Sequence, residues 1–168
     1  MASARSTRCP PRVFLLSPAR RDGKRARLLF EPATMFSVAA AIRAPDGAPI
    51  GEVFSFLSGL YFRGKLAYAE AFASPPLRLK TGAFVITTNR GLVSAATRVT
   101  LDDLARLAEV DIGGAPEPFR APLQRDAETL AKALGQCGEA VLLSSSGVPG
   151  FNPRCRRAPL PRGCARAR

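Results

Sequence analysis

The sequence predicts an α/β fold with three layers: a mostly parallel central sheet with flanking helices. Three short apolar runs carry this prediction, Val13 to Leu16, Ala83 to Thr87 and Ala140 to Leu143. None of them alternates with polar residues, which is typical of strands buried on both faces of a parallel sheet. Helical patterns separate the runs, and each run ends in hydroxyl-bearing residues, so we expect parallel strands joined by helices.

A chain of 168 residues with 46% apolar content is long enough for one domain with a real core. We expect a single α/β domain over 13–150, a basic disordered arm over 1–12 and a basic disordered tail over 151–168. The tail has no apolar periodicity and consists mainly of Arg, Pro, Ala and Cys. Two hypotheses explain it: a disordered extension, or a shifted reading frame that leaves the C-terminal part of the domain incomplete.

The formal net charge of +12 is confined to the two ends of the chain. Residues 1–29 hold eight basic residues and one acid, and residues 151–168 hold six basic residues and no acid, whereas 30–150 hold 11 basic and 12 acidic residues. A groove that follows nucleic-acid phosphates needs its cations within the folded domain. The composition therefore supports nonspecific nucleic-acid contact only through the basic termini, with solvated tails as the alternative.

The chain contains no His, which excludes Ser-His-Asp and Cys-His catalysis and every zinc site except an all-Cys one. The four Cys form no C-x-x-C pair, so we predict thiols without a metal site and no cofactor. The apolar run nearest the N-terminus, Val13 to Leu16, is too short for a signal-peptide core or a membrane span. A cytoplasmic protein without a membrane partner is the resulting expectation.

Residues 20–27, which include Lys24, form a strongly basic segment after Pro18. Two interpretations are open: a loop whose cations face a phosphate, or a solvated basic turn. The segment lacks the glycine and lysine spacing of a P-loop. Further on, Met35 to Arg43 is apolar without a decisive period, and Pro45-Asp46-Gly47 predicts a turn.

A helix is predicted from about Gly59 to Ala73, with Ser58 as its N-cap. Its first turns carry Tyr61, Arg63 and Lys65, which could bind an anion at the positive end of the helix dipole. The alternative is that the aromatic rings belong to the core and the cations face solvent. An apolar stripe at helical spacing supports the helix, formed by Phe62, Leu66, Ala69 and Ala73.

Two more helices are predicted after the second apolar run. Thr100-Leu101-Asp102-Asp103 resembles a capping box and precedes an apolar stripe, which indicates a short helix. A second helix is expected from about Pro122, a residue well suited to a first helical position, to Leu134. Gly135 is its predicted stop.

Parallel strands joined by helices bring their carboxyl ends to one edge of the sheet, where open α/β sheets usually hold ligands. Arg90 is expected to hold a phosphate or carboxylate bidentately, because Asp102 and Asp103 suit the start of their own helix. The alternative for the hydroxyls is that they cap the helices that follow. The residues expected to converge at this edge are Ser17, Thr87, Thr88, Asn89, Arg90, Ser144 and Ser145.

Hydroxyls, an amide and an Arg without an acid suit an anionic ligand. We therefore expect an α/β domain that binds a nucleotide, nucleobase or other phosphate-bearing molecule at its strand ends. The alternative is a non-catalytic nucleic-acid-associated protein that uses its basic termini. Whether the protein is an enzyme stays open, because no paired carboxylates, nucleophile with base, or metal cluster identifies a reaction.

Three motifs occur in order: Leu-Leu-Ser-Pro-Ala at 15–19, Gly-Leu-Tyr-Phe-Arg-Gly-Lys-Leu-Ala-Tyr-Ala at 59–69 and Thr-Thr-Asn-Arg-Gly-Leu at 87–92. This layout resembles the peroxide-stress YaaA family and related small bacterial domains of unknown function. The resemblance implies an α/β domain and, through YaaA, a link to DNA. Asn89-Arg90 departs from the Ser/Ala-x-aromatic or His pattern expected before Gly-Leu. The residues that match by position are Ser17, Tyr61, Tyr68, Gly91 and Leu92.

Overall fold

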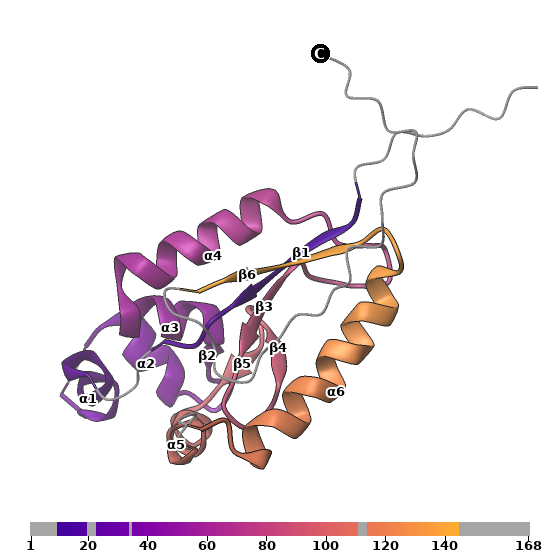
Figure 1. Cartoon of the computed structure of the whole chain (residues 1–168). Coiled ribbons are helices and arrows are strands. Elements are labelled where there is room, and N and C mark those ends of the chain that lie inside the picture. The colour runs from indigo at the N-terminus through magenta and orange to yellow at the C-terminus, as the bar shows by residue number, and fades with distance from the viewer. Residues whose placement is uncertain (1–9, 20–22, 34, 111–113, 145–168) are drawn as a thin grey trace, which may run out of the picture.

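The computed structural model describes residues 10–19, 23–33, 35–110 and 114–144. Over these ranges the chain forms a four-stranded sheet in the order β4-β3-β1-β6 with helices around it (Figure 1). The strands are β1 (Arg12–Leu16), β3 (Ala83–Ile86), β4 (Leu92–Ser94) and β6 (Glu139–Leu143). β1 is parallel to both β3 and β6, and β4 is antiparallel to β3. The predicted α/β fold with a mostly parallel sheet is confirmed.

Six helices and a small second sheet complete the described part of the chain. The antiparallel pair β2 (Ala48–Pro49) and β5 (Arg98–Val99) forms that second sheet. None of the helices in the described ranges is both long and apolar enough to cross a lipid bilayer. The helices are α1 (Lys24–Phe30), α2 (Ser37–Arg43), α3 (Ile50–Ser58), α4 (Leu60–Phe72), α5 (Leu101–Glu109) and α6 (Glu117–Leu134).

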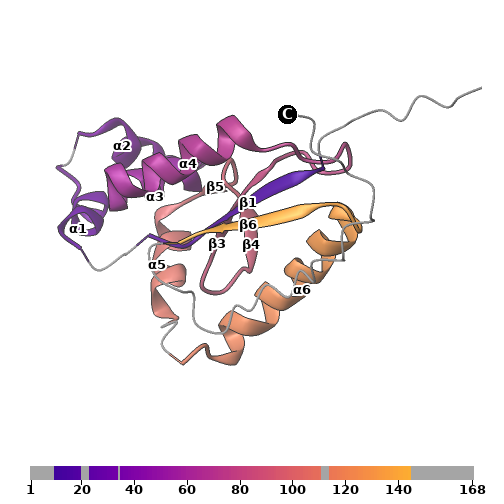
Figure 2. The same ribbon diagram turned by 45° about the horizontal axis from the view of Figure 1, so that its top comes forward.

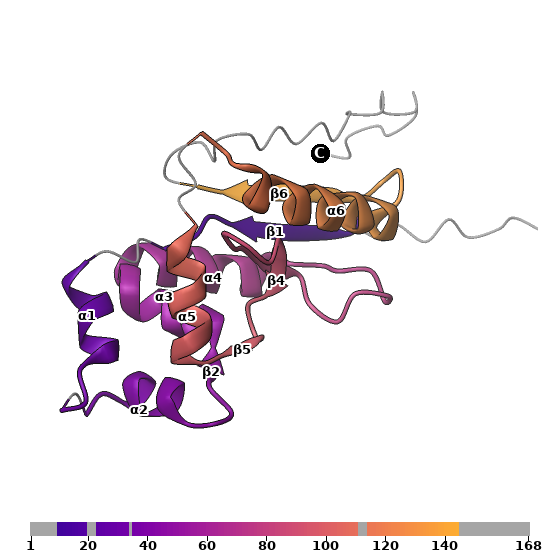
Figure 3. The same ribbon diagram turned by 90° about the horizontal axis from the view of Figure 1, so that it is seen from below.

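The sheet separates two hydrophobic clusters, and alternate residues of β1 enter one or the other. Phe14 and Leu16 pack in the larger cluster with residues of α3 and α4, while Val13 and Leu15 pack against α6. All four side chains are buried, as expected for a strand covered on both faces. Figure 2 shows α4 and α6 on opposite sides of the strands, and Figure 3, seen from below, shows α6 in front of β6.

The N-terminal segments differ from the prediction in two places. The sheet begins at Arg12, whose guanidinium donates to Glu139 at 2.9 Å, so this residue belongs to β1 and not to a disordered arm. The basic segment predicted as a loop or turn is helical from Lys24 onward. Its helix buries Ala26 and Leu29, which shows that tertiary packing uses an apolar face between the cations.

α4 matches the predicted helix closely, but its start differs. Ser58 is the last residue of α3, and Gly59 lies between the two helices with φ +62°. Glycine adopts this left-handed conformation without steric cost, so it can join two helices over a single residue. The predicted N-cap role of Ser58 is therefore wrong.

α6 starts earlier than predicted, at Glu117, and Pro122 lies inside it. Phe119 and Leu123 are both buried against the sheet, and they stand four residues apart on one helix face. The burial of these two side chains offsets the loss of one backbone hydrogen bond at Pro122. The predicted stop at Gly135 is confirmed, since this residue is the C-cap with φ +70°.

Candidate functional site

The carboxyl ends of the three parallel strands lie side by side. Leu16 is in register with both Val85 and Leu143, and the backbone amide of Ser17 donates to the carbonyl of Leu143 at 3.2 Å. Ser17 therefore stands between the ends of β3 and β6, and Ser144 follows directly after β6. Ser145 lies outside the described residues.

Ser17 is joined to Lys65, which lies one turn into α4. The Lys65 ammonium donates to the Ser17 hydroxyl at 2.7 Å, and Ser17 is only 7% exposed. The Lys65 Nζ also lies 5.0 Å from the centroid of the Tyr61 ring and 5.4 Å from that of Phe62, within the range of cation–π contacts. These contacts bring two predicted site residues, Ser17 and Tyr61, around one cation.

Lys65 has no acidic partner in the part of the chain that the structure describes: the ion pairs there involve other cations. Its surroundings are a hydroxyl and two aromatic rings, and its partial burial lowers the pKa of the ammonium below the usual 10.5. A desolvated cation with unused N–H donors is a favourable binding site for an anion, whose oxygens accept those hydrogen bonds.

Thr87 and Thr88 are buried, each only 1% exposed, and their hydroxyls have intramolecular partners. The Thr87 hydroxyl donates to the carbonyl of Gly91 at 2.9 Å and accepts from the amide of Arg90 at 3.1 Å. The Thr88 hydroxyl donates to the carbonyl of Leu107. Thr87 thus holds the turn between β3 and β4, and Thr88 ties this turn to α5.

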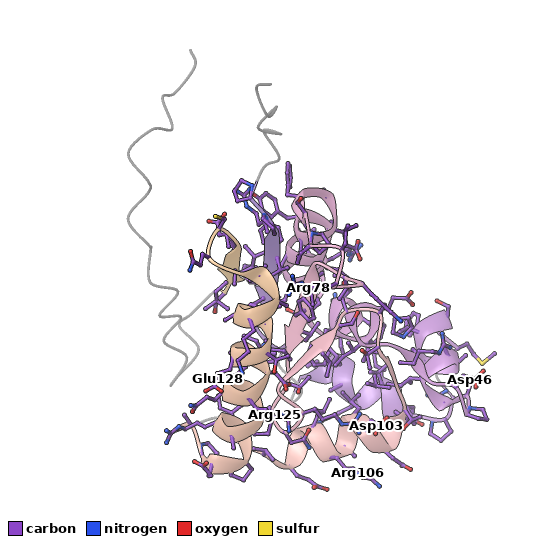
Figure 4. All side chains as sticks on the ribbon, turned by 90° about the vertical axis from the view of Figure 1, so that its right-hand side faces the viewer. Asp46, Arg78, Asp103, Arg106, Arg125 and Glu128 are labelled. Atoms are coloured by element: carbon purple, nitrogen blue, oxygen red, sulfur yellow. The ribbon has the colours of Figure 1, made fainter. Side chains whose placement is uncertain are left out.

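Asn89 and Arg90 also contact α5. The Asn89 side-chain amide donates to the carbonyl of Arg106 at 3.0 Å, and the Arg90 guanidinium is paired with the carboxylate of Asp103. Figure 4 shows Asp103 and Arg106 on this helix. The expectation that Asp103 serves only its own helix start is therefore wrong, and Arg90 has a protein partner in this structure.

Two predicted site residues, Arg63 and Lys24, make no side-chain hydrogen bond with Ser17 or Lys65 in the described part of the chain. Arg63 is two residues from Lys65 on α4, about 200° around the helix axis, so it points to a different side. It lines a shallow pocket together with Arg25 of α1. Lys24 is exposed at the start of α1. The structure therefore separates Arg63 from Tyr61 and Lys65, which the sequence prediction had grouped.

The Ser17–Lys65 contact is what sequence reasoning missed. Lys65 was recognised as a cation near a helix start, but its pairing with a residue 48 positions earlier has no local signal. The four-residue spacing between Tyr61 and Lys65 does indicate a shared helix face. In the described ranges, no group of three or more His, Cys, Asp and Glu residues could hold a metal ion.

Comparison with known proteins found no match: no family model matches the chain, and neither does any curated protein or solved structure.

Proposed function

We propose that this protein binds an anionic, phosphate-bearing small molecule at the carboxyl edge of its sheet, with Lys65 as the charged contact. Ser17 and the half-exposed ring of Tyr61 complete the proposed site. In this proposal the domain is a three-layer α/β unit, and the site lies where β1 and β6 end beneath the first turns of α4. A nucleotide suits the site, because its phosphate can meet the ammonium and its base can stack on an exposed aromatic ring.

The observation that carries the proposal is that Lys65 forms no ion pair with any described residue. A partly buried ammonium without a carboxylate costs free energy, since burial removes hydration and the Ser17 hydroxyl replaces only part of it. A bound phosphate would supply the missing negative charge and accept the remaining N–H donors. Ser17 would hold the ammonium in place, since its hydroxyl oxygen accepts from Nζ.

The test is a thermal-shift screen of the full chain with AMP, GMP, CMP, UMP, their nucleosides and inorganic phosphate, followed by calorimetric titration. We expect a nucleoside monophosphate to bind more tightly than its nucleoside. Lys65→Met keeps the aliphatic stem and removes the charge, so it should weaken this binding by about 1.5 to 3 kcal/mol, the usual range for a hydrogen bond to a charged group.

Lys132→Met is the matched control, because Lys132 is an exposed helical lysine on α6. It should leave nucleotide affinity unchanged, and Lys65→Arg should keep part of it. Equal affinity of the wild type and Lys65→Met for every compound would refute the proposal.

The nucleic-acid alternative depends on basic termini that lie almost entirely outside the described residues, in 1–9 and 145–168. The screen separates the two functions, because Lys65→Met leaves the termini intact. Nucleotide binding by the tails alone would be equally strong in both variants and would fall steeply with salt.

A further inference from the structure

A second concave surface lies among the N-terminal helices, on the side of α4 that carries Arg63. It is a shallow pocket of about 310 Å³ between α1, α3, the start of α2 and the first turn of α4. This volume is at the lower end of the range for small-molecule sites, so it suits a ligand of about one aromatic ring and one small polar group. The pocket is lined by Arg25, Leu28, Phe36, Ser55, Phe56 and Arg63.

Among the described residues, two guanidiniums line this pocket and no acidic residue does. The Arg25 guanidinium donates one hydrogen bond to the carbonyl of Phe56 at 3.2 Å, and Arg63 makes no hydrogen bond or ion pair with any described residue. The first turn of α4, where Arg63 is located, also contains no acid. The helix dipole makes the electrostatic potential at this N-terminus positive, and the guanidinium of Arg63 adds to it. A bound anion would therefore be stabilised here.

Gly59 leaves room for the Arg25 side chain at the pocket. A side chain on Gly59 would collide with the Arg25 guanidinium, because an added Cβ would overlap its Nη1 atom. The absence of a side chain at this junction between α3 and α4 lets the guanidinium lie over the backbone. Arg25 and Arg63 line the same pocket, and the Arg25 N–H donors that do not bond the Phe56 carbonyl are available to a ligand.

The rest of the lining is apolar, except for one unsatisfied hydroxyl. The rings of Phe36 and Phe56 are in contact at 5.6 Å between centroids, and Phe36 is 54% exposed. The Ser55 Oγ is buried and has no hydrogen-bond partner in the described part of the chain, although buried hydroxyls normally have one. A partly exposed aromatic wall beside two cations matches an anion that carries an aromatic group.

We propose that this pocket, defined by Arg25, Arg63, Ser55 and Phe36, is a second binding site for a small aromatic phosphate or carboxylate. The two guanidiniums would bind the anionic group, and the ring would pack on Phe36 and Phe56. This site is independent of the one at Lys65, because Arg63 and Lys65 point to different sides of α4.

Calorimetric titration of the full chain with phenyl phosphate tests the proposal, with inorganic phosphate and phenol titrated separately. Phenyl phosphate should bind more tightly than either fragment. Arg63→Gln should weaken its binding about tenfold or more, since it removes a charge-assisted contact. Phe36→Ala should reduce the affinity for phenyl phosphate and leave that for inorganic phosphate unchanged.

Arg78→Gln is the matched control, because Arg78 is an exposed arginine without a hydrogen bond or ion pair to described residues, in the segment after α4 (Figure 4). Arg78→Gln should leave phenyl phosphate binding unchanged, and Arg63→Gln should cause the same loss of affinity whether Lys65 is present or replaced by Met. Undetectable binding to the wild type would overturn the proposal, as would a loss caused by Lys65→Met and not by Arg63→Gln. Since the two sites use different cations, failure of the Lys65 site leaves this result intact.

Discussion

Arg90 and Asp103 form an ion pair that links the turn after β3 to the first turn of α5. The same carboxylate accepts from the Thr100 amide at 3.1 Å and so closes the capping box of that helix, which the sequence had predicted. Asp103 therefore has two structural roles, and Arg90 lies at the strand end with its charge already compensated.

Arg90→Ala should lower the free energy of unfolding by about 0.5 to 1 kcal/mol, the range for partly exposed pairs. The side chains are 37% and 21% exposed, so solvent screens much of the attraction. Chemical denaturation measures this effect. The same variant should change nucleotide affinity less than Lys65→Met does; a larger loss would restore Arg90 as the main anion contact.

The stability contributed by Asp103 should depend on pH. The backbone hydrogen bond from Thr100, together with the Arg90 charge, holds the pKa of the Asp103 carboxyl below its usual value. A lowered folded-state pKa means that the stability is present above the unfolded pKa of about 3.9 and is lost as pH falls through the folded pKa. Denaturant melts of wild type and Asp103→Asn should therefore differ most above pH ~4 and converge in stronger acid.

Asp102→Asn is the control for this pH dependence. Asp102 is the exposed neighbour of Asp103 and makes no ion pair with described residues. The difference in free energy of unfolding between wild type and Asp102→Asn should be smaller than the difference between wild type and Asp103→Asn. Equal pH dependence in the two variants would mean that general helix-terminus charge, and not the Thr100 and Arg90 contacts, produces the effect.

Gly91→Ala should reduce the free energy of unfolding by about 2 kcal/mol or more. Gly91 has φ +69°, which an L side chain rarely adopts, and an added Cβ would overlap the Asp126 carboxylate and the Pro122 carbonyl. Asp126 accepts from the Leu92 amide at 3.0 Å, so the clash would also disturb β4.

Gly64→Ala provides the opposite case within the same protein. Gly64 lies inside α4, and an added Cβ meets nothing within 4 Å. Alanine there should raise the free energy of unfolding by about 0.5 to 1 kcal/mol, because it restricts the unfolded chain. Similar melting temperatures for the two variants would show that the turn at Gly91 can rearrange.

Lys65→Met should stabilise the ligand-free protein most at neutral pH. Burial lowers the pKa of Lys65 below 10.5, so between the folded and unfolded pKa values the unfolded state binds more protons. Wild-type stability therefore rises with pH through this window, and the stability gap between the two proteins should shrink as pH approaches 10.5. If the difference in free energy of unfolding between wild type and Lys65→Met stays constant with pH, Lys65 has an unrecognised compensating charge.

The sequence alone determined the features that depend on neighbouring residues. The three apolar strands, the helix at 60–72, the capping box at Thr100 and the stop at Gly135 all follow from local spacing and conformational preference. The parallel direction of these strands also follows, because a helix that connects two strands of one sheet normally returns the chain to the end where the first strand began. These elements suffice to place the candidate edge of the sheet.

Only the tertiary structure decided which side chains meet. Packing of Phe119 and Leu123 against the sheet extended α6 through a proline, and the turn at Gly91 added β4 as an antiparallel edge strand. The contacts of Lys65 with Ser17 and of Arg90 with Asp103 join residues 48 and 13 positions apart. Side-chain partners depend on how whole elements are oriented in space, and the local pattern of a sequence contains no such information.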